Sequence, residues 1–389
     1  MEPLLGFVIV SSIFAIGDIV SIKSKSLLSV LFVASVFYLI GFWTIFPADI
    51  NTIAQVQGVG AMMIPVLITH MGTLLNTRQL IDQWKTVIIT IVALVGVGVL
   101  VYGVGGFIFG REVAIAASPP IAGGVVAGLI MSEAATAINR PELAVLATLL
   151  VVVQGFIGYP LASFCLTREA RKILSGEIVT DNAVSQSAAA EEKARFKLPQ
   201  LAEDLQTPFV LIAKVAVVAY LAVLLANAIP GTPIHPYVMT LIIGVIAGEI
   251  GLLETDILTK GNAFGFGILA LMAIIMTNLN QATPEMLAGL LAPMFGCLIL
   301  GAIGIAIGSS IVGKFLGLSI EMSTAIGVSA LFGFPGTFIL SHEAAKAATT
   351  SPEGRQKVLD HILPKMLVAG FMTVTIASVV MAGIFANWL

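Results

Sequence analysis

The chain has 389 residues, of which 58% are hydrophobic and only 11% charged, whereas roughly a quarter of the residues are charged in an ordinary soluble domain. This composition excludes a water-soluble enzyme. The net charge of −3 leaves no basic surface for nucleic acid. Cys165 and Cys297 both lie inside long apolar runs, which argues against a disulfide framework or a thiolate metal site.

Apolar segments of the length that a membrane-spanning helix needs, about 20 residues, follow one another along the chain. The chain starts Met1-Glu2-Pro3 and runs directly into an apolar stretch, so we expect the first span to be retained rather than cleaved as a signal peptide. In the first half we place spans at 4–22, 27–47, 55–75, 86–109 and 143–166. In the second half we place them at 208–228, 237–253, 262–279, 287–312 and 365–387.

Between the fourth and fifth span of each half lies an apolar segment that glycine and proline interrupt, at 112–138 and at 320–348. Proline lacks an N–H group and clashes with the preceding helical turn, so neither segment can form one continuous helix. We interpret both as helical hairpins that enter the membrane and turn back. The expected ends of the incoming halves and starts of the returning halves are Ser118 and Gly124 in the first, and Leu331 and Thr337 in the second.

The two halves resemble two copies of one unit. A shift of 204 places residues 277–280 on 73–76, and a shift of 210 places Gly333 on Gly123. Five full spans per copy is an odd number, so the second copy must be inverted. The predicted fold is therefore an all-α integral membrane protein with two inverted repeats, each of five transmembrane helices plus one re-entrant broken-helix hairpin. The repeats occupy 1–167 and 207–389, and a polar cytoplasmic linker occupies 168–206.

The distribution of basic residues predicts the orientation, because cytoplasmic loops are enriched in Lys and Arg. With both interrupted segments re-entrant and the N-terminus outside, sixteen of the nineteen basic residues lie inside, and only Arg111 and Arg140 lie outside. We therefore expect a multi-pass protein of the cell inner (plasma) membrane with both termini outside.

Inverted repeats with paired broken helices are typical of secondary transporters, which bind substrate and coupling ion near the midplane. The N-terminus of a half-helix carries a partial positive charge and unpaired N–H groups, which stabilise an anion. The residues that we expect to bind the substrate are Gly123, Gly124, Gly333, Gly336, Thr337 and Asn280. The residues that we expect to supply oxygen ligands for the coupling ion are Ser118, Ser329, Asn76 and Asn278.

Three ionisable residues follow the interruptions: Glu133, His342 and Glu343. The two carboxylates lie roughly 10 to 14 Å beyond the turns at 1.5 Å per residue, hence nearer a water interface than the midplane. They are the proton or charge sites if coupling is to protons rather than Na⁺. The run that starts at His342 begins like a zinc-peptidase motif, but Lys346 stands where the second histidine is required, so we expect no enzyme activity.

The ten spans, the two Gly/Pro interruptions and the segment 71–78 (MGTLLNTR) together resemble the bacterial sodium/glutamate symporter family. The stretch from Pro236-Tyr237-Val238 to Gly248 is similar to the eighth span of that family. The resemblance implies Na⁺-driven uptake by a homodimer in which a unit bearing the hairpins moves against a scaffold. No arginine stands at membrane depth to pair a second carboxylate, so glutamate is not carried over as the substrate.

The expected function is a cation-coupled secondary transporter, a Na⁺ symporter of a small anionic or zwitterionic solute such as an amino acid or carboxylate. No cofactor is expected besides Na⁺ as the coupling ion. A cation/proton antiporter is the first alternative, although such proteins place a carboxylate at the midplane. A channel or pore is the second, and a membrane enzyme is the third.

Overall fold

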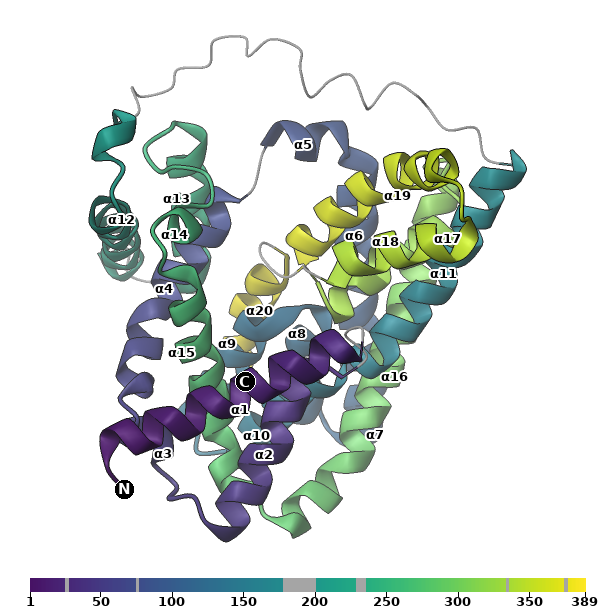
Figure 1. The fold of residues 1–389 in the computed structure, drawn as a ribbon. Coiled ribbons are helices and arrows are strands. Elements are labelled where there is room, and N and C mark those ends of the chain that lie inside the picture. Colours follow the sequence, from purple (N-terminus) through teal and green to yellow (C-terminus); the bar gives the residue numbers. More distant parts are fainter. Residues whose placement is uncertain (25–27, 75–76, 178–200, 229–235, 334–335, 374–376) are drawn as a thin grey trace.

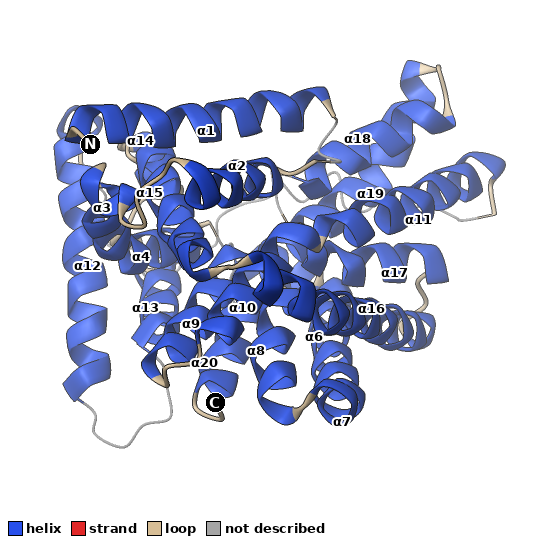
Figure 2. Ribbon diagram, turned by 90° about the horizontal axis from the view of Figure 1, so that it is seen from below, coloured by secondary structure: helices blue, strands red, loops and turns tan. Residues whose placement is uncertain are grey.

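The computed structural model describes residues 1–24, 28–74, 77–177, 201–228, 236–333, 336–373 and 377–389. Within these ranges all regular secondary structure is helical, and short loops join the helices (Figures 1 and 2). Seven helical stretches are long and apolar enough to cross a membrane, which is consistent with a membrane protein. They are Pro3–Lys23, Val56–Thr73, Trp84–Phe109, Pro141–Ser175, Pro208–Ala228, Phe264–Gln281 and Pro284–Phe315.

The helices of the first half are α1 (Pro3–Lys23), α2 (Val30–Thr44), α3 (Ile50–Ile53), α4 (Val56–Thr73), α5 (Thr77–Asp82), α6 (Trp84–Val97), the π-helix η1 (Gly98–Gly105), α7 (Gly106–Phe109), α8 (Arg111–Ala122), α9 (Gly124–Ala137), α10 (Pro141–Val153) and α11 (Gly155–Ser175). Those of the second half are η3 (Glu203–Leu205), α12 (Pro208–Ala228), α13 (Pro236–Glu249), α14 (Ile257–Lys260), α15 (Phe264–Thr277), η4 (Asn278–Gln281), α16 (Pro284–Phe315), α17 (Ile320–Val328), η5 (Ser329–Leu331), α18 (Gly336–Ala348), α19 (Pro352–Met372) and α20 (Ser378–Ala386).

Two of the expected spans are shorter in the structure. The helix α2 has only 15 residues and α13 only 14. Helix α2 stops before Pro47 because proline disfavours the helical conformation of the residue that precedes it, and the chain after α13 turns at Gly251, where φ is +77°. The span expected at 143–166 comprises α10 and the first part of α11, and for the span expected at 365–387 the structure describes α19 up to Met372 and α20 from Ser378.

Helix α11 continues to Ser175, so its last turns fall within the linker expected at 168–206. Its last turns remain amphipathic, with Cys165, Leu166, Ala170 and Ile173 buried at helical spacing. A helix that can bury such a stripe is stabilised beyond the end of its apolar run.

Two groups of helices make up the molecule (Figure 2). One, which we call the outer group, contains α1 to α4 and α12 to α15; the other, the inner group, contains α6 to α11 and α16 to α20. In the outer group α4 and α15 run antiparallel, since Gly60 faces Ala270 while Gly267 faces Met63 and Leu67. Small residues at these contacts let the helix backbones approach closely.

In the inner group α6 and α16 cross at Gly96 and Gly304. A Cβ atom on either glycine would lie 2.3 Å from the carbonyl oxygen of the other, so only glycine fits at this crossing. Gly308 faces Val92 and Gly301 faces Val101, which shows that these two helices are antiparallel as well.

Candidate functional site

The first broken segment consists of α8 and α9, which meet at Gly123, where φ is +145° and ψ is +108°. At the far end of α8, Glu112 forms an ion pair with Arg140, which follows α9. Ala116 of α8 and Ala135 of α9 belong to one buried apolar cluster. The ends of α8 and α9 remote from Gly123 therefore lie close together, and the chain reverses direction at this glycine.

The second broken segment consists of α17 and η5, followed by α18. Its first residues lie at the end of α11, where Lys172 Nζ is 2.7 Å from Glu321 Oε1. Its last turn lies near the same place, because Thr349 accepts a hydrogen bond from Arg355 and the adjacent Gly354 faces Leu174 of α11. This segment also reverses, and α11 packs against both of its arms.

The incoming helix of the first broken segment does not end near Ser118, as the sequence predicted, but continues to Ala122. Pro119 and Pro120 lie within its last turn, so the chain remains helical through both prolines. Since proline has no N–H group, the carbonyl groups four residues earlier, those of Ile115 and Ala116, lose their usual helical donors. The returning helices begin at Gly124 and Gly336, close to the predicted positions.

The tip of the first broken segment lies beside the end of α19 and the start of α20, and the tip of the second lies beside the α10–α11 junction. A Cβ atom on Gly123 would lie 2.6 Å from the carbonyl oxygen of Thr373, which follows α19, and 3.2 Å from Cβ of Ser378 at the start of α20. At the second tip, Leu331 packs on Gly158, one turn after Gln154 separates α10 from α11. The two reversing segments therefore converge in the middle of the inner group, beside the α10–α11 junction and the ends of α19 and α20.

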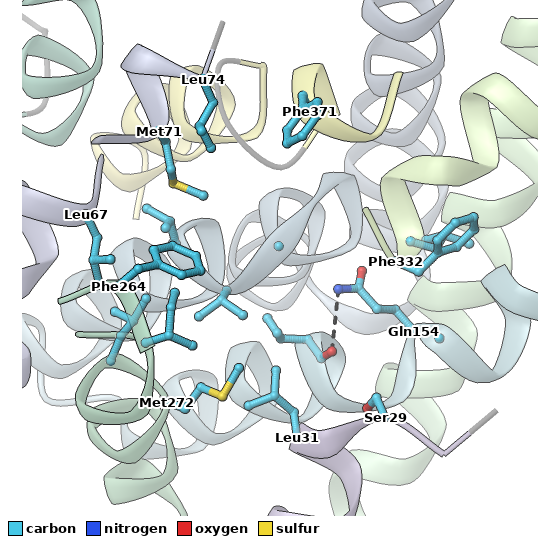
Figure 3. Close-up of a pocket in the computed structure, with 18 of the residues that line it drawn as sticks. Ser29, Leu31, Leu67, Met71, Leu74, Gln154, Phe264, Met272, Phe332 and Phe371 are labelled. Atoms are coloured by element: carbon cyan, nitrogen blue, oxygen red, sulfur yellow. Dashed lines mark hydrogen bonds between the residues drawn. The ribbon is translucent and has the colours of Figure 1, made fainter. Parts of the chain in front are cut away.

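A cavity of about 440 Å³ opens at this convergence, between the inner and outer groups (Figure 3). The inner group contributes side chains from the two tips, from the α10–α11 junction and from α19, and the outer group contributes side chains from α2, α4 and α15. The lining residues are Ser29, Leu31, Leu67, Met71, Leu74, Gly124, Val125, Val126, Val151, Gln154, Gly155, Tyr159, Phe264, Ile268, Leu271, Met272, Leu331, Phe332 and Phe371.

The cavity is mostly apolar, and none of the side chains that line it in the described part of the chain is charged. Its most buried polar side chain is Gln154, which is 5% exposed. Gln154 Nε2 donates to the carbonyl oxygen of Val151 at 3.5 Å, whereas Gln154 Oε1 is buried without a hydrogen-bond partner. The N-terminus of α9 also reaches the cavity, at Gly124, and no side chain caps it.

Of the six predicted substrate-binding residues, Gly124 lines the cavity and the other five do not. Gly333 has φ of +61° at the second tip. Gly336 faces Phe332 and Tyr159, and Thr337 packs on Gly370 with its hydroxyl buried and unpartnered. Asn280 is not brought to the cavity; its amide donates to the carbonyl oxygen of Ala48 at 3.0 Å.

The predicted ion ligands occupy several environments. The hydroxyls of Ser118 and Ser329 donate to carbonyl oxygens of their own helices, at 2.7 and 2.6 Å, which leaves their lone pairs as potential ligands. Asn278 donates instead to the Thr148 hydroxyl of α10 at 3.2 Å. Asn76 lies outside the described residues.

The three predicted charge sites do not line the cavity. Glu133 accepts a hydrogen bond from the hydroxyl of Tyr237 in α13. His342 Nδ1 lies 2.9 Å from the carbonyl oxygen of Phe338, and Glu343 lies 3.4 Å from Lys346. Glu133 therefore connects the inner group to the outer group through a hydrogen bond. The contact of His342 with the Phe338 carbonyl lies within α18.

Sequence reasoning missed the buried carboxylate of Glu169, which is only 1% exposed. Its Oε1 lies 3.2 Å from His361 Nε2 of α19, and its Oε2 accepts a hydrogen bond from Ser319, the N-cap of α17. A signal was present, because residue 169 stands four positions after Cys165 and four before Ile173 on the buried face of α11. Assigning this stretch to a linker concealed it.

Comparison with known proteins adds no assignment. A scan against protein-family models finds no match, and a search of curated proteins finds no significant match. The chemistry of the site must therefore be argued from its geometry.

Proposed function

We propose that this protein is a cation-coupled secondary transporter, a Na⁺ symporter of a small anionic or zwitterionic solute that works by alternating access. The observation that carries the proposal is the convergence of the tips of two reversing broken segments and the α10–α11 junction on one cavity. Non-helical backbone at membrane depth is tolerated where it lines such a cavity, and this arrangement is typical of transporters.

Inverted repeats are part of this proposal, and the lengths of the elements support them. Helices α1 and α12 have 21 residues each, and α3 and α14 have 4 each. Helix α8 has 12 residues, as do α17 and η5 together. The α10–α11 pair covers 141–175 and the α19–α20 pair covers 352–386, which is the same length. The antiparallel pairs α6 with α16 and α4 with α15 are what inversion of one copy requires.

An equivalent pair of contacts refines the alignment of the two copies. Asn51 of α3 donates to the Thr277 hydroxyl of α15 at 2.9 Å. The backbone N–H of Leu258 in α14 donates to His70 Nδ1 of α4 at 3.3 Å. One shift of 207 relates both residues of the first contact to those of the second, which improves on the shift of 204 that the sequence alone indicated in this region.

Each broken segment has an open end, where its two arms are remote from the tip. The positions of the two open ends support re-entrant hairpins that enter from opposite sides. Arg140 and the C-terminal Leu389 lie by the open end of the first broken segment. Lys172 and Arg355 lie by the open end of the second. From the positive-inside rule we infer that the open end of the second broken segment faces the cytoplasm and that the C-terminus lies on the outside. The membrane in this proposal is the plasma membrane. The homodimer implied by the sequence resemblance remains part of the proposal.

Uncharged oxygen atoms near the tips favour Na⁺ as the coupling ion, since a hard cation prefers oxygen ligands. The carbonyl oxygen of Thr373 and the unpartnered hydroxyl of Ser378 lie at the first tip, and the unpartnered hydroxyl of Thr337 lies by the second. A cation/proton antiporter needs a carboxylate at the centre, whereas the described residues that line this cavity have uncharged side chains. The geometry therefore favours Na⁺ symport over this alternative.

The topology can be tested with single cysteines and a membrane-impermeant thiol reagent, because the native Cys165 and Cys297 are buried. A cysteine at Ser351 should react only from the cytoplasm, and one at Asn139 only from outside. Labelling of Asn139→Cys from the cytoplasmic side would contradict the re-entrant first segment.

The coupling can be tested in proteoliposomes supplied with a mixture of labelled amino and carboxylic acids. A Na⁺ gradient should drive accumulation of at least one solute, and a proton ionophore should leave that accumulation intact. Accumulation that ignores Na⁺ and collapses with the ionophore would transfer the assignment to proton coupling, with Glu133, His342 and Glu343 as candidates. Non-saturating flux in both directions would indicate a channel.

A further inference from the structure

The cavity carries an unsatisfied hydrogen-bond acceptor. Gln154 is 5% exposed, and its Oε1 is buried without a partner. Figure 3 shows its amide directed toward the space between Phe264 and Phe332. A buried acceptor without a donor costs free energy in the empty protein, and a ligand that presents an N–H donor recovers it.

The same cavity carries donors. The first N–H groups of α9 have no partner within the helix, no side chain caps them, and Gly124 at this end lines the cavity. Gly123 and Gly124 have no side chains to cover these groups. The end of this 14-residue helix is also the positive end of its dipole, so the site offers a place for one carboxylate.

The remaining walls are apolar and come from both helix groups. The apolar side chains that line the cavity include Leu67, Met71, Phe264, Met272, Phe332 and Phe371. With a volume of about 440 Å³ the cavity has room for a side chain of the size of leucine or phenylalanine. Because the lining side chains within the described ranges carry no charge, a second carboxylate would be buried among them without a counter-charge, at a large cost.

We propose that the cavity binds an α-amino acid with an apolar side chain, its ammonium group donating to Gln154 Oε1 and its carboxylate accepting from the N-terminus of α9. This assignment rests on the proposed function and specifies its substrate class. Acidic amino acids and dicarboxylates are excluded by the uncharged walls, and an amine or a fatty acid satisfies only one of the two polar groups.

The test measures binding to the purified full-length protein by isothermal titration, with four probes. L-leucine carries both polar groups; 4-methylpentanoate lacks the ammonium, 3-methylbutylamine lacks the carboxylate, and L-glutamate adds a second carboxylate. L-leucine should bind at least about tenfold more tightly than either single-group analogue, since a lost charge-assisted hydrogen bond costs about one to two powers of ten in affinity. L-glutamate should not bind.

Two variants of Gln154 test whether its side chain binds the ammonium group of the ligand. Gln154→Leu should weaken L-leucine binding about tenfold to a hundredfold while barely changing the binding of 4-methylpentanoate. Gln356→Leu is the matched control, because Gln356 lies on the exposed face of α19 and bonds only Asp360 among the described contacts. Gln154→Glu, which has nearly the same shape and therefore guards against misfolding, should strengthen 3-methylbutylamine binding and abolish that of 4-methylpentanoate.

Equal affinity of wild type and both Gln154 variants for L-leucine would overturn the assignment, as would L-glutamate binding as tightly as L-leucine. Failure of the substrate class and failure of the transport function are distinguishable. If the proteoliposomes accumulate another solute while L-leucine neither binds nor is carried, the substrate class is wrong and the transporter stands. If L-leucine binds as expected but never crosses, the site stands and the transport function is wrong.

Discussion

The two broken segments start from the same sequence device, a Gly/Pro interruption, but pack in different ways. The arms of the first contact each other through small residues such as Ala116 and Ala135, and its open end is closed by the exposed ion pair of Arg140 and Glu112. The arms of the second pack on α11, and its open end is held by the buried carboxylate of Glu169.

The difference teaches that a break in a helix specifies a reversal but not what stabilises it. Small side chains let α8 and α9 approach directly, so the first segment is stabilised mainly by close packing. The second depends on a polar network that involves α11, α17 and α19. We therefore expect the two segments to respond differently to substitutions at their open ends, and similarly to substitutions at their tips.

The largest effect is expected at the tips. Gly123→Val and Gly333→Val should each lower Na⁺-driven uptake at least about a hundredfold, because displacing a binding group by about 1 Å is enough for such a loss. At Gly123 a Cβ would also collide with the Thr373 carbonyl. Uptake is measured in proteoliposomes, normalised to folded protein by size-exclusion chromatography. Normal transport by both variants would remove the tips from the binding site.

The tips can be separated by milder changes. Gly333→Asn should retain most activity, because asparagine adopts a φ near +61°, whereas Gly123→Asn should not, since φ there is +145°. Gly289→Val is the control, as nothing lies within 4 Å of that position. Gly110 would be a poor control position, because a side chain there would be strained at a φ of +97°.

At the open ends the two segments should differ in stability. Glu169→Ala should lower the free energy of unfolding by about 3 kcal/mol, since removal of one partner of a buried pair is strongly destabilising. Glu112→Ala should cost less than about 1 kcal/mol, because that pair is exposed. Thermal unfolding in detergent, with both variants at the same protein concentration, checks the difference. Equal shifts would mean that the burial of Glu169 has no energetic consequence.

A smaller effect is expected on the coupling ion. Thr337→Val should raise the Na⁺ concentration for half-maximal uptake about tenfold, because it removes an unpartnered buried hydroxyl. Ser118→Ala and Ser329→Ala should raise it about two- to fourfold, since these hydroxyls already donate within their helices. In all three variants the half-saturating substrate concentration should change less than that of Na⁺. The reverse ranking would make the serines the principal ligands.

The smallest effect concerns the contact between the helix groups. If the inner group moves against the outer group, the hydrogen bond from Tyr237 to Glu133 breaks in each cycle. Glu133→Gln should weaken it and raise the maximal transport rate about two- to fivefold. Glu343→Gln, whose ion pair with Lys346 lies within α18, should leave the rate unchanged. Slower transport by Glu133→Gln would show that the contact assists the cycle.

Much of the fold follows from local sequence chemistry. The apolar segments and the breaks at Gly123 and Gly333 are predictable because proline and glycine act on the chain that contains them. The end of α8 was placed too early, since two prolines at the end of a helix remove donors without ending it. Asn280 was assigned to the site by its amide, but its partner is the distant Ala48.

The sequence by itself determined that this chain is helical, with segments long and apolar enough to span a membrane and two interrupted ones, because hydropathy and backbone restrictions are properties of short stretches. Only the tertiary structure decided that Gln154, Phe264 and Phe332 share one cavity and that Glu169 meets His361. These contacts join helices that are distant in sequence, and helix packing, which depends on how surfaces fit, selects among many pairings that the same apolar pattern allows.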